Sequence, residues 1–271
     1  MAADLDRLAA WLRCPVCTAD LRPVDRLTLG CGNGHRHDVN KRGYVALLGS
    51  GTSHVGDTAD MLDARERVLE GGAYSPIAAA VSAACSGEHI VDAGAGTGYY
   101  LRAALPGRPG AHGLAMDLSA QAVARAVRSS DRIDGLVADT WRPLPIRSGV
   151  ADVVLDVFAP RNLPEFQRVL RPDGRLVVVV PRADHLGSLR ETGTMLDIPS
   201  DKADDVIHAS ETLYALLRRE HVAYDLPLTD DLRTALIAMG PSARHASRHT
   251  AEPVTVGSTR VSVDVLLFSR R

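Results

Sequence analysis

The chain has 271 residues, with 31 Lys and Arg against 33 Asp and Glu, which gives a formal net charge of −2. This balance excludes a simple polybasic protein that binds nucleic acid or anionic membranes through a global positive field. Hydrophobic residues make up 45% of the chain and charged residues 24%, which is typical of a folded globular protein and excludes disorder as the main state. The length fits one large domain, or a medium domain with a small appendage.

Apolar stretches such as Leu176–Val180 are far shorter than the ~20 residues that a membrane-spanning helix needs. The chain does not open with a charged and then apolar segment, so we expect neither a membrane span nor secretion by a standard signal. Three of the four cysteines lie within the first 31 residues and Cys85 stands alone, which does not suit a disulfide scaffold. We therefore expect a cytoplasmic protein.

The first part of the chain is divided by a linker. The pattern predicts a helix over 5–12, followed by turn signals and a cysteine cluster that ends near residue 48. Such a segment is too short to build much of a core by itself. The Gly- and Ser-rich stretch 49–56 indicates a linker, and a helix is expected over 58–70. The expected division is a small domain over 1–50, a linker and helix over 51–75, and a large domain over 76–271.

From residue 76 onward, predicted helices and strands alternate. Alternation of this kind indicates an α/β fold with a mostly parallel sheet. After Pro181 we expect a mostly helical stretch, a strand near 220–227, a helix over 229–238 and a last strand over 260–269. The earlier elements are helices over 76–85, 97–105, 119–129 and 162–170, and strands over 89–93, 112–116, 133–138, 150–157 and 174–180.

The cysteine cluster has the spacing of a zinc site. Cys14 and Cys17 are separated by two residues, and Cys31 and His35 follow after thirteen more. Three thiolates and one imidazole complete a tetrahedral Zn²⁺ site, which leaves no position for a catalytic water, so the metal is expected to be structural. His37 is an alternative fourth ligand. Buried structural cysteines beside surface histidines are the alternative to a metal site.

Acidic residues end three consecutive predicted strands. The first strand runs into a glycine-rich loop that opens a helix, and Asp117 ends the next strand about twenty residues further on, where it can bind both ribose hydroxyls. Asp139 ends the third strand, in position for an adenine amino group. Carboxyl ends of parallel strands meet in one crevice, although each carboxylate alone could be a helix cap or a turn residue. The expected cofactor-binding residues are Asp92, Gly94, Gly96, Asp117 and Asp139.

The loop distinguishes between two nucleotide cofactors. A dinucleotide-binding loop usually has the spacing G-x-G-x-x-G, because the pyrophosphate rests on the helix N-terminus. Here the spacing from Gly94 to Gly98 is G-x-G-x-G, and Asp92 would place a negative charge near any phosphate. The methionine part of S-adenosylmethionine carries a positive amine and no phosphate. The sequence therefore favours S-adenosylmethionine over NAD.

Beyond the zinc spacing and the cofactor loop, further stretches make a specific combination. Together they resemble the bacterial 23S rRNA guanine-N1 methyltransferases of the RlmA type, most closely the tylosin-resistance branch of actinomycetes. The resemblance covers nearly the whole chain. The stretches that carry it besides the two motifs are His37-Asp38, Gly43-Tyr44-Val45, Gly71 to Pro76, Val157 to Asn162, Leu170 to Gly174, Asp184-His185-Leu186 and Met239 to Ser242.

The resemblance implies a class I S-adenosylmethionine-dependent methyltransferase, with a Rossmann-like seven-stranded sheet, behind a zinc domain that helps to hold a 23S rRNA hairpin. It also implies a homodimer. The target would be N1 of the guanine at nucleotide 748, with nucleotide 745 of the same hairpin as the alternative. The positions that match cofactor-binding residues of the family are Tyr74, Gly96, Thr97, Asp117 and His185.

The end of the fourth predicted strand is the expected place of the acceptor base. N1 lies on the Watson–Crick edge of guanine and carries a proton, so the base must be unpaired and the proton removed. Asp156 is the candidate general base and Phe158 the candidate stacking residue, with an ion-pair partner and a core aromatic as the respective alternatives. Arg161, Arg182 and the Lys41-Arg42 pair are candidates for phosphate contacts.

Two other classes of protein share these features. A small-molecule methyltransferase could have the same cofactor domain, although a small substrate needs no accessory zinc domain. A non-catalytic cofactor-binding protein is disfavoured because the loop and all three strand-end carboxylates are intact. The sequence leaves open whether methylation would confer resistance to macrolides such as tylosin.

Overall fold

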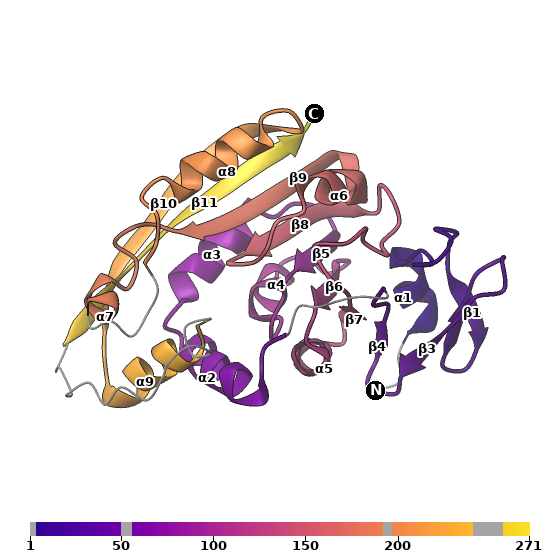
Figure 1. Ribbon diagram of the computed structural model, residues 1–271, viewed down its shortest axis with the longest axis horizontal. Helices are drawn as coiled ribbons and strands as arrows, with labels where there is room; N and C mark the ends of the chain where they lie inside the picture. Colours follow the sequence, from indigo (N-terminus) through magenta and orange to yellow (C-terminus); the bar gives the residue numbers. More distant parts are fainter. Residues whose placement is uncertain (1–3, 50–55, 192–196, 241–256) are drawn as a thin grey trace.

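The computed structural model describes residues 4–49, 56–191, 197–240 and 257–271. A single sheet crosses the molecule from the N-terminal strands at one end to β10 and β11 at the other, with helices on both faces (Figure 1). Within the described residues the sheet has eleven strands, in the order β1-β2-β3-β4-β7-β6-β5-β8-β9-β11-β10.

Seven of these strands come from the part of the chain after residue 76. Five are parallel, and β11 runs antiparallel between β9 and β10. The expected α/β fold with a mostly parallel sheet is therefore confirmed. The seven strands are β5 (His89–Ala93), β6 (His112–Asp117), β7 (Ile133–Val137), β8 (Ala151–Val157), β9 (Leu170–Pro181), β10 (Tyr214–Pro227) and β11 (Ser258–Arg270).

The expected count of seven strands is wrong for the sheet as a whole, because the N-terminal segment adds four strands to the seven that follow residue 76. Strand β4 pairs in parallel with β7, with Val45 opposite Leu136. An unpaired edge on β7 would expose a row of backbone N–H and C=O groups in a strand whose five side chains are all buried. Strand β4 pairs with that edge, and the other three strands extend the sheet beyond it. The four added strands are β1 (Arg22–Asp25), β2 (Thr28–Gly30), β3 (Arg36–Asn40) and β4 (Tyr44–Ala46).

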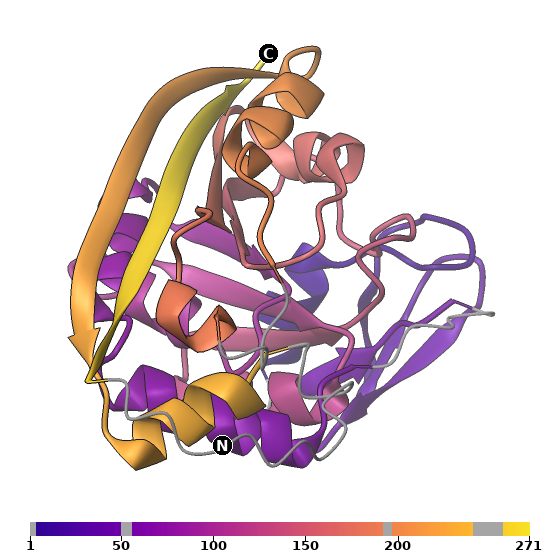
Figure 2. The same cartoon turned by 60° about the vertical axis from the view of Figure 1, so that its left-hand side comes forward.

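The helices lie close to their predicted bounds. Both views place α2 and α9 side by side below the sheet (Figures 1 and 2). Pro76 lies in the first turn of α3, and Thr58 caps α2 by accepting from the backbone N–H of Met61. The helices are α1 (Leu5–Trp11), α2 (Ala59–Glu70), α3 (Ser75–Ala84), α4 (Tyr99–Ala104), α5 (Ala120–Ser129), α6 (Leu163–Val169), α7 (Gly187–Arg190), α8 (Lys202–Ser210) and α9 (Asp230–Ala238).

Strand β10 begins six residues before its expected start near residue 220. Most of its side chains are exposed or half-buried, so its apolar pattern is weak. Its length is set by pairing with β11, which continues to Tyr214 opposite Arg270. In the described part of the chain, no helix is both long and apolar enough to cross a bilayer.

The N-terminal segment shares a core with the sheet. Leu8, Leu12 and Leu29 pack in the same buried cluster as Val154 and Val178 from the central strands. The segment, which was expected to be too short to build much of a core by itself, thus buries its apolar side chains in the core of the sheet. The expected linker at 49–56 lies largely outside the described residues.

A buried carboxylate fixes α1 on the sheet. Asp134, within β7, has a side chain that is 5% exposed and accepts from Arg7 Nε at 2.8 Å and Nη2 at 2.9 Å. The indole Nε1 of Trp11 donates to the same carboxylate at 3.1 Å. Three donors from one helix thus meet one acidic residue of β7.

We predict that Asp134→Ala lowers the free energy of unfolding by about 1–3 kcal/mol, because Arg7 and Trp11 lose a buried acceptor. Urea denaturation followed by circular dichroism measures the change. Asp131→Ala is the matched control, since that side chain is exposed and only its backbone carbonyl binds Arg7. Equal stability of the two variants would contradict this account of the docking.

Candidate functional site

The glycine-rich loop after β5 lies against the loop that follows β8. Gly94, Gly96 and Gly98 all have positive φ, at +83°, +54° and +79°, a conformation that favours glycine. A Cβ on Gly94 would lie 2.5 Å from the Cβ of Ala159. Glycine is therefore required at position 94, where the cofactor loop meets the loop after β8. We call that loop, residues 158–162, the acceptor loop, because it is the expected place of the acceptor base.

Asp117 is held by backbone donors at the end of β6. The N–H of Gly96 donates to Oδ2 at 2.9 Å and the N–H of Ser119 to Oδ1 at 2.8 Å. Burial raises the pKa of Asp117, and these two hydrogen bonds oppose the increase. Each carboxylate oxygen can accept a second hydrogen bond, so the pair of ribose hydroxyls remains a suitable ligand. Asp139, two residues after the end of β7, accepts from the N–H of Trp141 at 3.0 Å.

Three buried polar atoms around the loop have no hydrogen-bond partner among the described residues: Asp92 Oδ2, Thr97 Oγ1 and Tyr100 Oη. Asp92 is 2% exposed. Burial, with a smaller contribution from Asp117, raises its pKa to about 7. Buried polar groups are rarely left unpaired in native proteins, so this cluster fits a polar ligand. A cationic amine, such as that of S-adenosylmethionine, would pair with Asp92.

An aromatic cluster lies beside the loop. The ring of Phe158 is 6.2 Å from Tyr74, 6.4 Å from Tyr100 and 6.0 Å from His185, measured between centroids. Tyr74 and His185, expected to bind the cofactor, are also 6.0 Å apart. The structure thus brings the expected stacking residue together with two expected cofactor residues.

His185 orients the hydroxyl of Tyr74. The backbone N–H of Ser262 donates to His185 Nδ1 at 3.2 Å, so the neutral ring carries its proton on Nε2, which lies 3.3 Å from Tyr74 Oη. Burial lowers the pKa of His185 to about 4, and the ring is therefore neutral at physiological pH. With its oxygen accepting from His185, the Tyr74 hydroxyl can donate its proton to a ligand.

Phe158 owes its place in this cluster to its backbone. Side chains alternate along β8, and Asp156 faces the same side of the sheet as Val154. Phe158 would follow on that side, but its φ of +56° lets the ring pack instead with Tyr74 on the opposite side. A non-glycine residue in this conformation costs of order 1–3 kcal/mol, and such strain is common at functional sites.

Asp156 lies apart from the aromatic cluster. Its side chain is fully buried and neither oxygen has a hydrogen-bond partner among the described residues. Arg161 Nη1 approaches Oδ1 at 3.6 Å. Burial raises the pKa of Asp156 well above its usual range, and the charge of Arg161 opposes this increase. Of the other expected phosphate contacts, Lys41 and Arg42 are exposed, whereas Arg182 is paired with Asp264 at 3.1 Å.

The four expected zinc ligands come together within the N-terminal segment. One ligand atom from each of Cys14, Cys17, Cys31 and His35 lies within 4.8 Å of the other three. A tetrahedral ion with Zn–S bonds of about 2.3 Å needs ligand atoms roughly 4 Å apart, so the group fits the metal. His37 lies beside it, with Nε2 3.5 Å from Cys14 Sγ, but outside the group of four. A hydrogen bond from the backbone of Ala19 lowers the pKa of Cys17 to about 6, which favours the thiolate.

Two residues of the cofactor crevice are missed by sequence reasoning. Tyr100, whose hydroxyl is buried, lies in the first turn of α4, just after the loop. A tyrosine at the start of a helix after a glycine-rich loop is a local signal that could have indicated this residue. Arg65 lies over the loop, with Nη1 3.1 Å from the position of a Cβ on Gly96 and 2.5 Å from Asp57. No spacing in the sequence indicates the contact of Arg65, since it is made across the fold.

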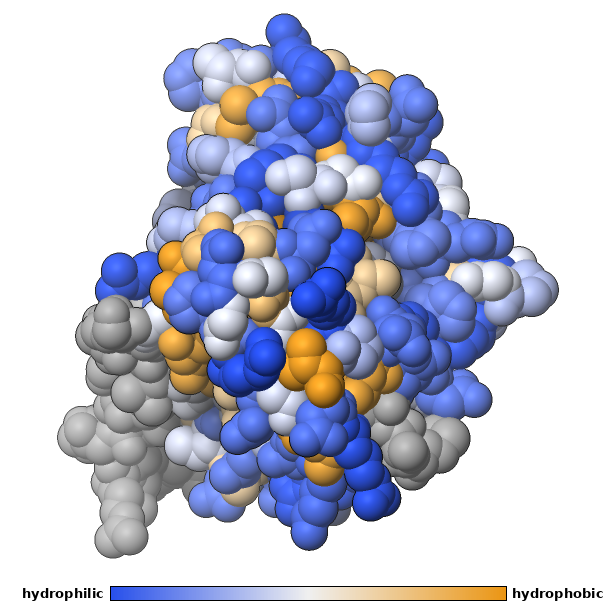
Figure 3. Space-filling view, turned by 90° about the vertical axis from the view of Figure 1, so that its right-hand side faces the viewer, coloured by the Kyte–Doolittle hydropathy of each residue, from blue (hydrophilic) through white to orange (hydrophobic). Residues whose placement is uncertain are grey.

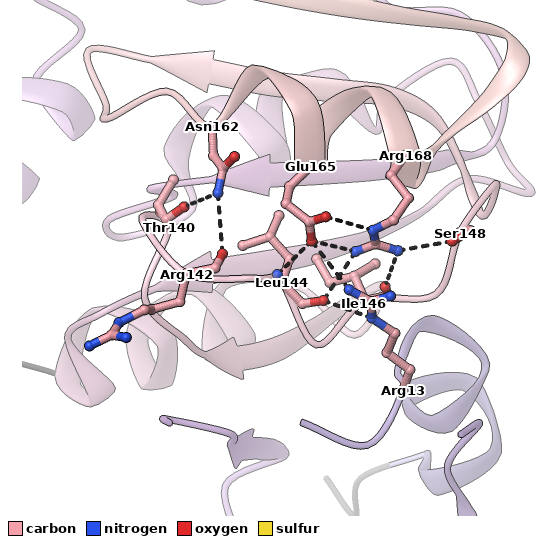
Figure 4. A network of polar contacts seen from close by, with 9 residues as sticks. All are labelled: Arg13, Thr140, Arg142, Leu144, Ile146, Ser148, Asn162, Glu165 and Arg168. Carbon is pink, nitrogen blue, oxygen red and sulfur yellow. Dashed lines mark hydrogen bonds and ion pairs between the residues drawn. The ribbon is translucent and has the colours of Figure 1, made fainter. Parts of the chain in front are cut away.

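A polar network connects the zinc segment to α6, the helix that follows the acceptor loop (Figure 4). Arg13, next to Cys14, donates to the carbonyl of Leu144 at 3.0 Å and to Glu165 at 3.3 Å. Glu165 also accepts from the N–H of Leu144 and from Arg168, both at 2.7 Å. Because Glu165 lies on α6, which follows the acceptor loop, the zinc segment braces that helix.

Two family models match the chain. The model described as "RlmA, N-terminal", a zinc ribbon, matches residues 12–51, and the model described as "Methyltransferase domain" matches residues 91–178. The first covers all four residues of the proposed metal site. The second begins before the cofactor loop and ends within β9.

Relatives match across both regions. The chain is 40% identical over 242 residues to the 23S rRNA (guanine(748)-N(1))-methyltransferase of Streptomyces fradiae, covering 87% of this chain and 86% of the relative. A relative from Micromonospora griseorubida, provisionally named a 23S rRNA guanine-N1 methyltransferase, is 41% identical over 90% of this chain and 93% of its own. Among solved structures, that of MccD protein matches with a TM-score of 0.51 at 14% identity, over 74% of this chain and 98% of its own, and supports the fold alone.

We predict that the purified protein holds about one zinc ion per chain and that Cys14→Ser loses most of it. The variant should also be less stable, because structural zinc contributes to folding free energy. Metal analysis and thermal unfolding measure both effects. Cys85→Ser is the control, since Cys85 is buried elsewhere and its thiol donates to the carbonyl of Val81. Full zinc content in Cys14→Ser would rule out this ligand set.

We predict that the affinity for S-adenosylmethionine falls as the pH drops below about 7. Asp92 must be ionised to pair with the cofactor amine, and below its raised pKa binding requires the loss of a proton. The dissociation constant should therefore increase as the pH falls, with a slope that approaches a factor of ten for each pH unit. Calorimetry between about pH 5.5 and 7.5 tests this. Asp92→Asn should bind roughly 10- to 100-fold more weakly and without this slope, whereas a flat wild-type profile would exclude the pairing.

Proposed function

Since the chain belongs to the family of 23S rRNA guanine-N1 methyltransferases, we propose that it transfers a methyl group to N1 of guanine 748 in a 23S rRNA hairpin. The observation that carries the proposal is that one chain combines the zinc ribbon and the cofactor crevice, with 40% identity extending over 87% of its length to a relative of that name. Guanine 745 of the same hairpin is the alternative target.

We assign the cofactor crevice to S-adenosylmethionine, which supplies a methyl group on a positively charged sulfur. Asp92 would pair with the amine, Asp117 with the ribose hydroxyls and Asp139 with the adenine amino group. The unpaired buried atoms of Asp92 and Thr97 support this placement. The remaining proposed contacts come from the backbone of Gly94 and Gly96 and from the side chains of Tyr74 and His185.

Phe158 would stack on the target guanine. It is 39% exposed, and its ring lies at the border between the aromatic cluster and solvent. A base stacked there would be held beside Tyr74 and His185, the residues proposed to contact the cofactor. Stacking of an unpaired base on an aromatic ring is the common mode of RNA base recognition, and an in-line approach of N1 to the methyl group requires such positioning.

Asp156 is the proposed acceptor of the N1 proton. A carboxylate with a pKa raised by burial is, once ionised, a stronger base than an exposed one. Both of its oxygens are closed to solvent and have no hydrogen-bond donor among the residues that the structure describes. The assignment therefore requires Arg161 and the acceptor loop to shift when RNA binds, so that guanine or a water molecule reaches Asp156.

The zinc ribbon would help to hold the hairpin. The face of the molecule on that side is mainly hydrophilic, with small separate apolar patches (Figure 3). Exposed cations such as Lys41 and Arg42 lie on the turn between β3 and β4, where they could contact phosphates. We further propose that the protein acts as a homodimer in the cytoplasm, and that methylation at 748 confers resistance to macrolides such as tylosin.

The function is tested by incubating the protein with radiolabelled S-adenosylmethionine and unmodified 23S rRNA, and by mapping the product through reverse-transcription stops. A cofactor-dependent stop at 748 supports the proposal, since N1-methylguanine cannot pair normally. A stop at 745 moves the target. Cofactor binding with no incorporation into RNA would overturn the proposal and favour a small-molecule acceptor or a non-catalytic protein.

We predict that Asp156→Asn lowers kcat at least about 100-fold, as the loss of a general base commonly does, and leaves the affinity for S-adenosylmethionine unchanged. The residual rate should also lose the rise with pH that ionisation of Asp156 gives the wild type. Asp173→Asn, at an exposed carboxylate, is the control. A variant with wild-type kcat would remove Asp156 from the chemistry.

A further inference from the structure

Trp141 is an exposed tryptophan on a fixed turn. Trp141 is 56% exposed, whereas Trp11, the other tryptophan of the chain, is 2% exposed. Among the described residues, the large hydrophobic side chains that are exposed include two aromatic ones, Trp141 and Phe158. No aromatic ring of the described chain packs within contact distance of the Trp141 indole.

The backbone around Trp141 is held from both sides. Its own N–H donates to Asp139 Oδ1 at 3.0 Å. The side-chain amide of Asn162 donates to the carbonyl of Thr140 at 2.8 Å and to that of Arg142 at 3.2 Å, the two neighbours of Trp141 (Figure 4). The turn is therefore fixed although the indole itself is largely in solvent.

Asn162 also connects this turn to the acceptor loop. It precedes α6 and ends the stretch that begins at Phe158. The two exposed aromatic residues thus lie on turns after β7 and after β8, two strands that β6 and β5 separate in the sheet, and the side chain of Asn162 joins the turns. Each turn carries a cation beside its aromatic residue, Arg142 next to Trp141 and Arg161 in the acceptor loop.

We propose that Trp141 is a stacking platform for an unpaired nucleotide of the RNA next to the target guanine. The inference rests on the proposed function, because its occupant is part of the same RNA. An exposed, rigidly based aromatic ring next to cations matches the way proteins bind single-stranded RNA, with bases on aromatic faces and phosphates on arginine. Phe158 and Trp141 would then hold two nucleotides, with Asn162 fixing the spacing between them.

The cofactor's adenine is the competing occupant, since Asp139 lies two residues before Trp141. The exposure of the indole favours RNA. The unpaired atoms of Asp92, Thr97 and Tyr100 that mark the cofactor crevice are buried, whereas the indole is more than half exposed. A ring that covered the adenine would be expected to face this buried region.

Tryptophan fluorescence tests the platform directly. Trp11 supplies a constant background because it is buried against His89, 5.6 Å between ring centroids. A transcript of the 23S rRNA hairpin containing nucleotide 748 should quench the fluorescence of the wild type, because the base stacks on the exposed indole. Trp141→Phe should lose the quenching. S-adenosylmethionine alone should quench neither protein.

Methylation kinetics give the second readout. Trp141→Ala should raise the KM for the hairpin about tenfold or more, the order expected for the loss of one base–aromatic stack, and leave the affinity for S-adenosylmethionine unchanged. Trp141→Phe, which keeps a ring, should recover most of the affinity for RNA. Leu217→Ala, at an apolar side chain that is 48% exposed on β10, is the matched control.

Each other outcome overturns the inference. A weaker affinity for S-adenosylmethionine in Trp141→Ala, or quenching by the cofactor alone, would assign the indole to the adenine. An unchanged KM for RNA would leave Trp141 without a role in binding. If the wild-type protein methylates the hairpin but Trp141 proves to act on the cofactor or not to affect the KM for RNA, the stacking platform is wrong and the proposed function stands. If the wild-type protein does not methylate the hairpin, the proposed function itself is wrong.

Discussion

Backbone hydrogen bonds between β4 and β7 join the zinc ribbon to the cofactor-binding sheet, and the positions of both sites depend on them. The pairing sets Tyr44 opposite Gly135, where a Cβ on the glycine would lie 2.6 Å from that of Tyr44. Since a strand register is fixed by such close contacts, the ribbon has one place on the sheet edge. Asp134, one residue away, then receives the donors of α1.

Burial sets the electrostatics of two carboxylates near the crevice. Asp92 and Asp156 lie at the carboxyl ends of neighbouring strands, on opposite sides of the sheet, and burial raises the pKa of each. Water could satisfy their charges if they were exposed, but the fold excludes it. Asp92 lies near unpaired hydroxyl groups, which suits a polar ligand. Asp156 lies near a cation instead, so the two carboxylates have different surroundings and separate proposed roles.

Short polar side chains hold the loops of the crevice in place. Asn162 joins the turn after β7 to the loop after β8, and Glu165 joins α6 to Arg13 beside the first zinc ligand. Arg13 and Glu165 therefore link the metal site by direct contact to α6, the helix that follows the acceptor loop. This gives the zinc ribbon a mechanical connection to the chemistry in addition to any contact it makes with RNA.

Local pattern in the sequence predicted most of the elements and proposed both ligand sets. The zinc spacing, the glycine-rich loop and the strand-end positions of Asp92, Asp117 and Asp139 are properties of short segments, and the structure brings each set together. Periodicity also predicted most helices and strands to within a few residues, because their apolar positions repeat with the period of the element. The resemblance to the methyltransferase family rested on the same short motifs taken in combination.

Tertiary structure alone decided the features that arise between distant segments. The eleven-stranded sheet depends on an edge of β7 that no local pattern reveals, and the length of β10 depends on its partner β11. The left-handed backbone of Phe158 places its ring on the side of the sheet where Tyr74 lies. The contacts of Arg65, Tyr100 and Asn162 join segments that are far apart in the sequence. The sequence by itself determined which residues were candidates for the chemistry, since residue type and spacing are local. Which of them face one another was decided by packing, because burial and strand pairing act between parts of the chain that are far apart.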